Sequence, residues 1–350
     1  MFKKSLSFVI FGVLILSSLA CSLSQCAQQP QNTERAESEP QEIAPTEIIP
    51  EETQETNHPG YILYSDPNGL YLLDLENFQS QQLVTGDISG GEISPDGQYL
   101  AYFEVSPDPN NWQYHKLRVM DIDTGVQLDV SSVPEDINTF AWSTFPGQIT
   151  YTRRNWDYCS EFIDHQITGI YQINVLNNET TTLHIGTDQY VFWVEKWSPE
   201  GRYLLFSHGP DCSEGRSLMY YDSQTGDVDG IPFAEASWSP KGNYLAAHEF
   251  WYWDPEELPL MQYQIPTGEQ QELFFEPGYY ASNPVWSPDG EWLAFTISTV
   301  EGNQSEPMLL NMSTGETNTI PLLNALPDFW NPASDSLILS IRTEDNNRDI

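Results

Sequence analysis

The sequence predicts an all-β fold, built from six copies of one four-stranded antiparallel unit. Two observations predict it. One turn motif recurs six times at nearly even spacing along the 350 residues. The composition includes 25 prolines and 22 glycines, which interrupt the chain too often for long helices. Hydrophobic residues still make up 39% of the chain, which is enough for a folded core.

The recurring motif is a large apolar residue followed by Ser-Pro-x-Gly or a close variant. The six copies begin at Ile93, Trp142, Trp197, Trp238, Trp286 and Trp330. Successive copies are 49, 55, 41, 48 and 44 residues apart. Propeller blades of four short strands repeat about every 40–50 residues. The spacing therefore predicts a six-bladed β-propeller of four-stranded antiparallel blades.

Two turn signals divide each repeat into strands. Ser-Pro-Asp-Gly, as at residues 94–97, suits a tight turn, because proline fixes one φ angle and glycine accepts the conformation at the exit. An x-Thr-Gly sequence, as at residues 121–125, suits a hairpin with a left-handed glycine. Each blade is thus predicted as strand, Ser-Pro-x-Gly turn, strand, variable loop, strand, x-Thr-Gly turn, strand.

Two copies depart from the motif, since the copy at Trp142 carries one extra residue and the copy at Trp330 lacks the glycine. These tandem repeats resemble the TolB-type propeller family, relatives of WD-repeat propellers, over about residues 58–341. The resemblance implies a rigid ring that mediates protein contacts in the cell envelope. TolB also carries an α/β domain before its propeller. Residues 22–57 cannot supply that domain, so a role in the Tol system does not carry over.

The two ends of the chain are expected to close the ring together. Strands are predicted at residues 61–65, 70–75 and 81–84, and again at 325–330 and 336–341. Together these segments supply one blade with a strand to spare, which gives six blades with the five internal ones. Pairing the chain ends in this way would protect the edge strands.

The N-terminus predicts an exported protein. Lys3 and Lys4 precede an apolar run of 11 residues and a small-residue exit at 18–20, so residues 1–20 are predicted as a signal peptide. Cys21 directly after this exit resembles the lipidation site of bacterial lipoproteins. Residues 21–57 contain almost no large apolar side chains and are predicted to be a disordered acidic tether. Residues 58–350 would then form the propeller, on a membrane-anchored lipoprotein that faces the periplasm or the cell exterior.

The net charge of −38 restricts the partners. Nucleic acid and anionic headgroups would repel so acidic a chain, so we expect no nucleic-acid partner and membrane contact only through the lipid. A protein with a basic surface or a glycan remains as a partner.

The loops between the second and third strands of each blade vary most in length and concentrate aromatic residues. Aromatic side chains beside carboxylates are typical of interface hot spots and of sugar-binding platforms. The alternative is that they cap the blade ends as core. The candidate partner- or ligand-binding residues are Trp112, Tyr114, Trp156, Tyr158, Trp251, Tyr252 and Trp253. Cys159 and Cys212 lie in corresponding loops of adjacent blades, which favours a disulfide in an exported protein.

The sequence predicts no catalytic residues, no metal and no cofactor. A Gly-x-Ser-x-Gly nucleophile motif is absent, which excludes a prolyl-oligopeptidase type of enzyme. His208 and His248 stand 11 and 10 residues after their motif tryptophans, so within their strands they should face opposite sides. The sequence therefore favours a non-catalytic binding or scaffolding protein. A carbohydrate-binding propeller is the alternative, and a metal-dependent polysaccharide lyase is less favoured.

Overall fold

The computed structural model describes ten segments, which are residues 61–75, 77–105, 115–130, 137–153, 169–185, 191–209, 216–248, 258–299, 304–331 and 333–341. They contain 25 strands in seven antiparallel sheets. No helix long and apolar enough to cross a bilayer occurs in these segments. The predicted all-β fold is confirmed.

Five of the sheets have four strands, in the order in which the strands follow along the chain. Their strands are β4 (Ile88–Ile93), β5 (Tyr99–Val105), β6 (His115–Asp121) and β7 (Gln127–Leu128); β8 (Ile137–Trp142), β9 (Gln148–Arg153), β10 (Gly169–Asn174) and β11 (Glu179–Ile185); β12 (Val191–Trp197), β13 (Tyr203–Gly209), β14 (Ser217–Asp222) and β15 (Val228–Ile231); β16 (Glu235–Trp238), β17 (Leu245–His248), β18 (Leu260–Tyr263) and β19 (Gln270–Phe274); β20 (Tyr279–Trp286), β21 (Trp292–Thr299), β22 (Ser305–Asn311) and β23 (Thr317–Thr319).

The other two sheets come from the ends of the described chain. β1 (Tyr61–Asp66), β2 (Gly69–Asp74) and β3 (Ser80–Thr85) form a three-stranded sheet, and β24 (Ala325–Trp330) pairs with β25 (Leu337–Ile341). These strands begin and end within a residue of the predicted ones. None of the described strand pairs joins the two groups. The predicted count of six blades is therefore not confirmed, because each end of the chain pairs with its own sequence neighbours.

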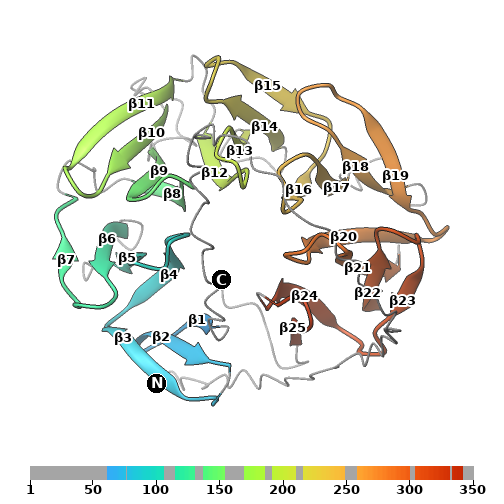
Figure 1. Ribbon diagram of the computed structural model, residues 1–350, viewed down its shortest axis with the longest axis horizontal. Coiled ribbons are helices and arrows are strands. Elements are labelled where there is room, and N and C mark those ends of the chain that lie inside the picture. The colour runs from blue at the N-terminus through green and yellow to red at the C-terminus, as the bar shows by residue number, and fades with distance from the viewer. Residues whose placement is uncertain are drawn as a thin grey trace, which may run out of the picture.

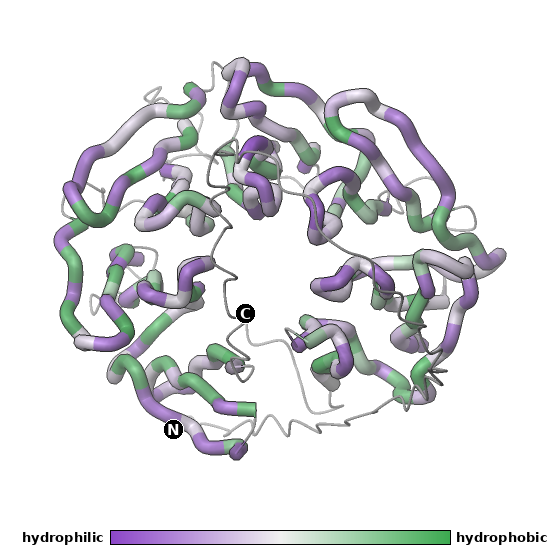
Figure 2. The backbone as a smooth tube through the Cα atoms, viewed as in Figure 1, coloured by the Kyte–Doolittle hydropathy of each residue, from purple (hydrophilic) through white to green (hydrophobic). Residues whose placement is uncertain are grey.

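The sheets lie side by side in a ring, and each runs from the centre outward (Figure 1). The first strand of each four-stranded sheet, together with β1 and β24, lies nearest the centre. The outermost strands carry exposed polar side chains, as in the Glu-Thr-Thr-Thr start of β11 and in β23, and Figure 2 shows hydrophilic colour along this rim. Buried clusters join neighbouring sheets, so the core is divided among the interfaces between blades.

The two predicted turns occur where the sequence placed them. In the turn between β12 and β13, Gly201 N–H donates to the Ser198 carbonyl (2.8 Å) and Tyr203 N–H donates to the Ser198 hydroxyl (2.9 Å). Gly201 has a φ of 74°, which favours glycine. In the copy that lacks glycine, Ser334 takes the left-handed conformation with a φ of 62°. There Asn331 Oδ1 accepts from Ser336 N–H (3.1 Å), which replaces the serine hydroxyl.

The motif tryptophans connect each sheet to the one before it. Their indole N–H groups donate to the backbone carbonyl of the residue that precedes the motif position in the previous blade. These bonds join Trp142 to Glu92 (2.9 Å), Trp238 to Lys196 (3.4 Å), Trp286 to Ser237 (3.2 Å) and Trp330 to Val285 (3.1 Å). Trp197 donates instead to the Thr150 hydroxyl (2.9 Å). The repeat is thus explained by contacts between blades as well as by turns within them.

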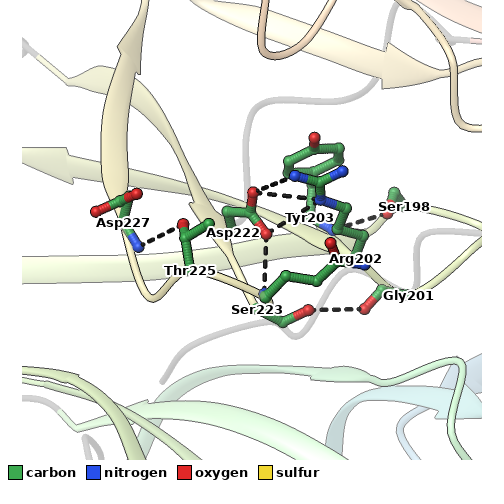
Figure 3. A network of polar contacts seen from close by, with 9 residues as sticks. Ser198, Gly201, Arg202, Tyr203, Asp222, Ser223, Thr225 and Asp227 are labelled. Carbon is green, nitrogen blue, oxygen red and sulfur yellow. Dashed lines mark hydrogen bonds and ion pairs between the residues drawn. The ribbon is translucent and has the colours of Figure 1, made fainter.

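An ion pair fastens the two turns of the β12–β15 sheet to each other (Figure 3). Arg202 Nη2 lies 2.7 Å from Asp222 Oδ2, and Arg202 Nε donates to both carboxylate oxygens at 3.2 Å. Gln224 N–H also donates to Asp222 Oδ1 (2.9 Å). The hydrogen bond from Arg202 is the main reason that the pKa of Asp222 lies below its ordinary value. Both turns lie at the same end of the strands, which we call the turn end.

Candidate functional site

The site residues predicted from the sequence lie outside the described residues. This holds for the aromatic residues Trp112, Tyr114, Trp156, Tyr158, Trp251, Tyr252 and Trp253, and for Cys21, Cys159 and Cys212. Their roles in binding, lipidation and disulfide formation stay predictions. The strands before and after these loops are described, and the candidate site is built from them.

A pocket of about 600 Å³ lies between the inner strands of four consecutive sheets. It is formed by β12, β16, β20 and β24, together with parts of β13 and β14, and in Figure 1 these inner strands border the centre of the ring on one side, from the top to the lower right. Its polar lining residues are Glu195, Ser207, Arg216, Glu235, Asn283 and Asp328. Its apolar lining residues are Leu218, Ala234, Ala236, Pro284, Val285, Leu326 and Pro327.

The pocket extends to the side of the ring from which the variable loops leave. Arg216 directly follows the loop segment 210–215 and precedes β14. Ala234 lies in the connection from β15 to β16, which is on the same side as the variable loops in an up-and-down sheet. We call this side the loop end, opposite the turn end.

Irregularities in the inner strands bring several polar residues to the pocket. The register of β12 on β13 shifts between Val194 and Lys196, and β24 on β25 shifts between Pro327 and Phe329. Glu195 and Asp328 are the extra residues of these bulges. A bulge residue leaves the regular ladder and its side chain is re-aimed. In β20 the shift spans Asn283, whose φ is 49°.

Glu195 lies in an unusual environment for a carboxylate. The Ser207 hydroxyl donates to Glu195 Oε1 (2.9 Å). The side chain is open to the pocket, yet the surrounding protein raises its pKa through burial. The negative charge of Glu235 raises this pKa further, whereas the Ser207 hydrogen bond and the Arg216 charge lower it. The guanidinium of Arg216 stacks on the Trp193 ring, 3.9 Å from the ring centroid.

The other two carboxylates of the pocket differ from each other. His248 Nε2 is hydrogen-bonded to Glu235 Oε2 at 3.1 Å, and this bond lowers the pKa of Glu235 against the opposing effect of burial. Asp328 accepts a hydrogen bond from the Ser340 hydroxyl (3.2 Å), but burial outweighs it and raises the pKa of Asp328. The pocket therefore holds three carboxyl groups, and two of them are disfavoured as anions.

His208 and His248, the two histidines compared in the sequence, have different neighbours. His248 bonds to Glu235 at the pocket, whereas the His208 ring lies 6.4 Å from the ring of Phe192 and nearly parallel to it. Phe192 belongs to a buried cluster between sheets. Within the described segments, no group of three or more His, Cys, Asp or Glu residues is arranged to hold a metal ion.

Comparison with solved structures decides the fold. An oligogalacturonate lyase from Vibrio parahaemolyticus superimposes with a TM-score of 0.62 at 15% identity, over 81% of this chain and 87% of that one. This chain has the β-propeller fold. A putative TolB from Agrobacterium tumefaciens has a TM-score of 0.50 at 12% identity, over 77% of this chain and 96% of that one.

The fold shared with the putative TolB of Agrobacterium tumefaciens is the fold that the resemblance of the repeats implies. A TolB from Acinetobacter baumannii has a TM-score of 0.48 at 18% identity over 75% of this chain, and this chain spans 63% of its length. No family model matches the sequence, and no curated protein matches it. Because the similar structures include both an enzyme and TolB proteins, the fold leaves the chemistry to be argued from the site.

The pocket between β12, β16, β20 and β24, which we call the central pocket, was not predicted from the sequence. The positions of two acidic residues could have indicated it. Glu195 interrupts the otherwise apolar start of β12, two residues before the motif tryptophan. Asp328 holds the same position before Trp330. An acidic residue at this position of a central strand needs an explanation, because ionised carboxylates are rarely placed in such strands.

Proposed function

We propose that this chain is an exported binding or scaffolding lipoprotein of a bacterial cell envelope, whose propeller is non-catalytic and binds a protein with a basic surface. Residues 1–20 direct export, Cys21 carries the lipid, and residues 21–57 hold the propeller away from the membrane. The partner contacts the central pocket, which extends to the loop end of the ring, and the aromatic residues of the variable loops.

The acidic lining of the central pocket carries this proposal. Three carboxyl groups face the pocket, from Glu195, Glu235 and Asp328, against the single guanidinium of Arg216. The whole chain has 51 acidic and 13 basic residues. A basic partner would be attracted over a distance by the whole surface and held at the site by complementary charge.

The aromatic loops are assigned to the same interface. Trp112, Trp156, Trp251 and Trp253 belong to loops that leave the ring at its loop end. Large aromatic side chains provide the well-packed anchors of protein interfaces, and charged residues at the rim set the partner and the association rate. A carbohydrate ligand is the second candidate, favoured by the same tryptophans, and its binding would depend little on salt.

The proposal is tested by a photo-crosslinking amino acid placed at Trp251 in living cells, with the adducts identified by mass spectrometry. A control probe is placed at Asp123, which is exposed in a hairpin turn at the turn end. A discrete protein adduct from position 251 that is absent from position 123 supports the proposal. Glycan adducts alone favour the carbohydrate candidate, and equal adducts from both positions contradict a specific interface.

A further inference from the structure

We propose that the central pocket is a socket for one lysine or arginine side chain of the partner, which enters from the loop end. This inference rests on the proposed function and names the chemistry of its central contact. It follows from the charge of the pocket, from the acceptor capacity of its carboxyl groups, and from the position of its apolar wall.

The charged groups of the pocket are unequally distributed. Glu195, Glu235 and Asp328 face it from three different sheets. Arg216 is the basic residue of its lining, and its guanidinium already stacks on Trp193. A cation entering between the three sheets would meet carboxyl groups on several sides.

Two of these carboxyl groups have acceptor capacity to spare. Ser207 donates to one oxygen of Glu195, and Ser340 donates to one oxygen of Asp328. An ionised carboxylate offers about four acceptor positions. Burial raises the pKa of both groups, because neither is fully compensated by a positive charge. An ammonium or guanidinium would supply both the charge and the N–H donors, and such charge-assisted bonds are the stronger kind.

The shape of the pocket fits a side chain with a charged head and an apolar stem. One wall consists of Pro284 and Val285 from β20 and Leu326 and Pro327 from β24. Lysine and arginine lay their methylene stems along apolar surface while the head remains in a polar environment. A volume of about 600 Å³ lies within the range of about 300–1,000 Å³ for ligand pockets. It holds such a side chain together with its flanking backbone.

The inference is tested with the mature chain carrying Cys21→Ser, so that it purifies without lipid. The probe is the tripeptide acetyl-Gly-Lys-Gly-amide, and its affinity is measured by titration calorimetry. The matched control peptide carries acetyl-lysine, which keeps the stem and removes the charge. We expect the lysine peptide to bind and the acetylated peptide to bind at least about tenfold more weakly. Equal affinity for the two peptides would overturn the inference, and so would the absence of lysine binding.

Variants then locate the binding. Glu195→Gln and Asp328→Asn each remove one charge from the pocket, and we expect each to weaken lysine binding by about tenfold. Asp227→Asn removes one charge from an exposed position in a turn-end hairpin and should change the affinity by less than about twofold. Equal losses in the pocket and turn-end variants would show general attraction to an acidic chain, and would overturn the socket.

The failure of the socket and the failure of the proposed function can be told apart. If the probe at Trp251 captures a protein but the pocket variants bind the lysine peptide normally, the partner binds elsewhere on the loop end. That result would support the proposed function and contradict the proposed lysine or arginine socket. If the lysine peptide binds in the pocket but no protein adduct forms at position 251, the pocket is a site for a basic ligand. That result would contradict the proposed binding of a protein partner.

Discussion

Two carboxylates of the β12–β15 sheet, Asp222 and Glu195, have opposite environments. At the turn end, Asp222 is held by two nitrogens of Arg202 and by a backbone N–H, and its pKa is lowered. At the pocket, Glu195 receives the hydroxyl of Ser207, and its pKa is raised. The Arg202 charge therefore offsets that of Asp222, whereas the surroundings of Glu195 offset its charge only in part.

This difference separates stability from binding. The turn end is repeated from blade to blade, and its polar groups bond to partners a few residues away or in the adjacent turn. The pocket is built once, from residues of four different sheets. A carboxylate whose charge is offset only in part lowers the stability of the fold. Under the proposed function, the positive charge of the bound partner would offset this cost. The following predictions test this division.

The largest effect is expected from Trp142→Ala. Trp142 is 3% exposed and donates to the Glu92 carbonyl of the preceding sheet. Truncating a buried tryptophan costs about 3–5 kcal/mol, measured by urea denaturation. Trp142→Phe keeps most of the apolar contact and loses the indole N–H, which should cost about 1 kcal/mol. Equal losses in the two variants would show that the indole bond, and not the packing, connects the sheets.

Gly201→Ala should cost about 2 kcal/mol at the turn end. Its φ of 74° is unfavourable for alanine, and a Cβ atom would collide with the Thr144 hydroxyl. Gly226 provides a matched control, because its φ is 79° but a Cβ there has no neighbour within 4 Å. Gly226→Ala should therefore cost only the backbone strain, about 1 kcal/mol. The difference in the unfolding temperature of the two variants measures the steric contribution at Gly201. Identical decreases in the two unfolding temperatures would contradict the close approach of Gly201 to the Thr144 hydroxyl.

Asp222→Asn should lower the free energy of unfolding at pH 7 by about 1 kcal/mol, allowing for the solvent exposure of Arg202. Because the pKa of Asp222 is lower in the folded state, its stabilisation is present above the unfolded-state pKa and is lost as the pH falls through the folded-state pKa. The difference in the free energy of unfolding between the original protein and Asp222→Asn should therefore become smaller below about pH 4. Urea denaturation from pH 2 to pH 7 measures this, and a gap independent of pH would contradict the ion pair.

Glu195→Gln should have the smallest effect on stability, and in the opposite direction. Because the pKa of Glu195 is higher in the folded state, ionisation costs stability, and the cost grows as the pH rises from the unfolded-state pKa through the folded-state pKa. The variant should match the original below about pH 4 and exceed it at pH 7 by a few tenths of a kcal/mol. Arg216, Glu235 and Ser207 act on this carboxyl group. A destabilised variant at pH 7 would contradict incomplete compensation.

The turns and strand limits were predictable because their signals are local. Ser198 and Gly201 define their turn within four residues, and the same spacing and hydrogen bond return in three other copies, at Ser94, Ser239 and Ser287. Even the copy without glycine keeps the geometry, since Asn331 and Ser334 take over the two roles. The closing of the ring by the two chain ends was predicted but is not confirmed, because no described strand pair joins β1–β3 to β24–β25. Whether segments so far apart in the sequence pair depends on the curvature of the whole ring, which no local signal gives.

The pocket could not be predicted for a related reason. Glu195 and Asp328 stand at comparable places in their strands, but only the ring brings β12 and β24 to the same cavity. An acidic residue two positions before the motif tryptophan marks both strands, but nothing in the sequence shows that bulges direct these two side chains into one cavity. The hydrogen bonds from the indole N–H groups to the preceding sheet were not predicted either. The repeated tryptophan marks the end of a strand in the sequence, but it does not show which residue accepts the hydrogen bond.

The most direct test of this division between stability and binding compares Glu195→Gln with Asp222→Asn in one experiment. Both remove one negative charge from the same sheet, and both are measured for the free energy of unfolding and for affinity toward acetyl-Gly-Lys-Gly-amide at pH 7. We predict that Glu195→Gln binds the peptide about tenfold more weakly and keeps its stability, whereas Asp222→Asn loses stability and keeps its binding. Loss of both properties in either variant, or weaker binding in Asp222→Asn at unchanged stability, would contradict the account.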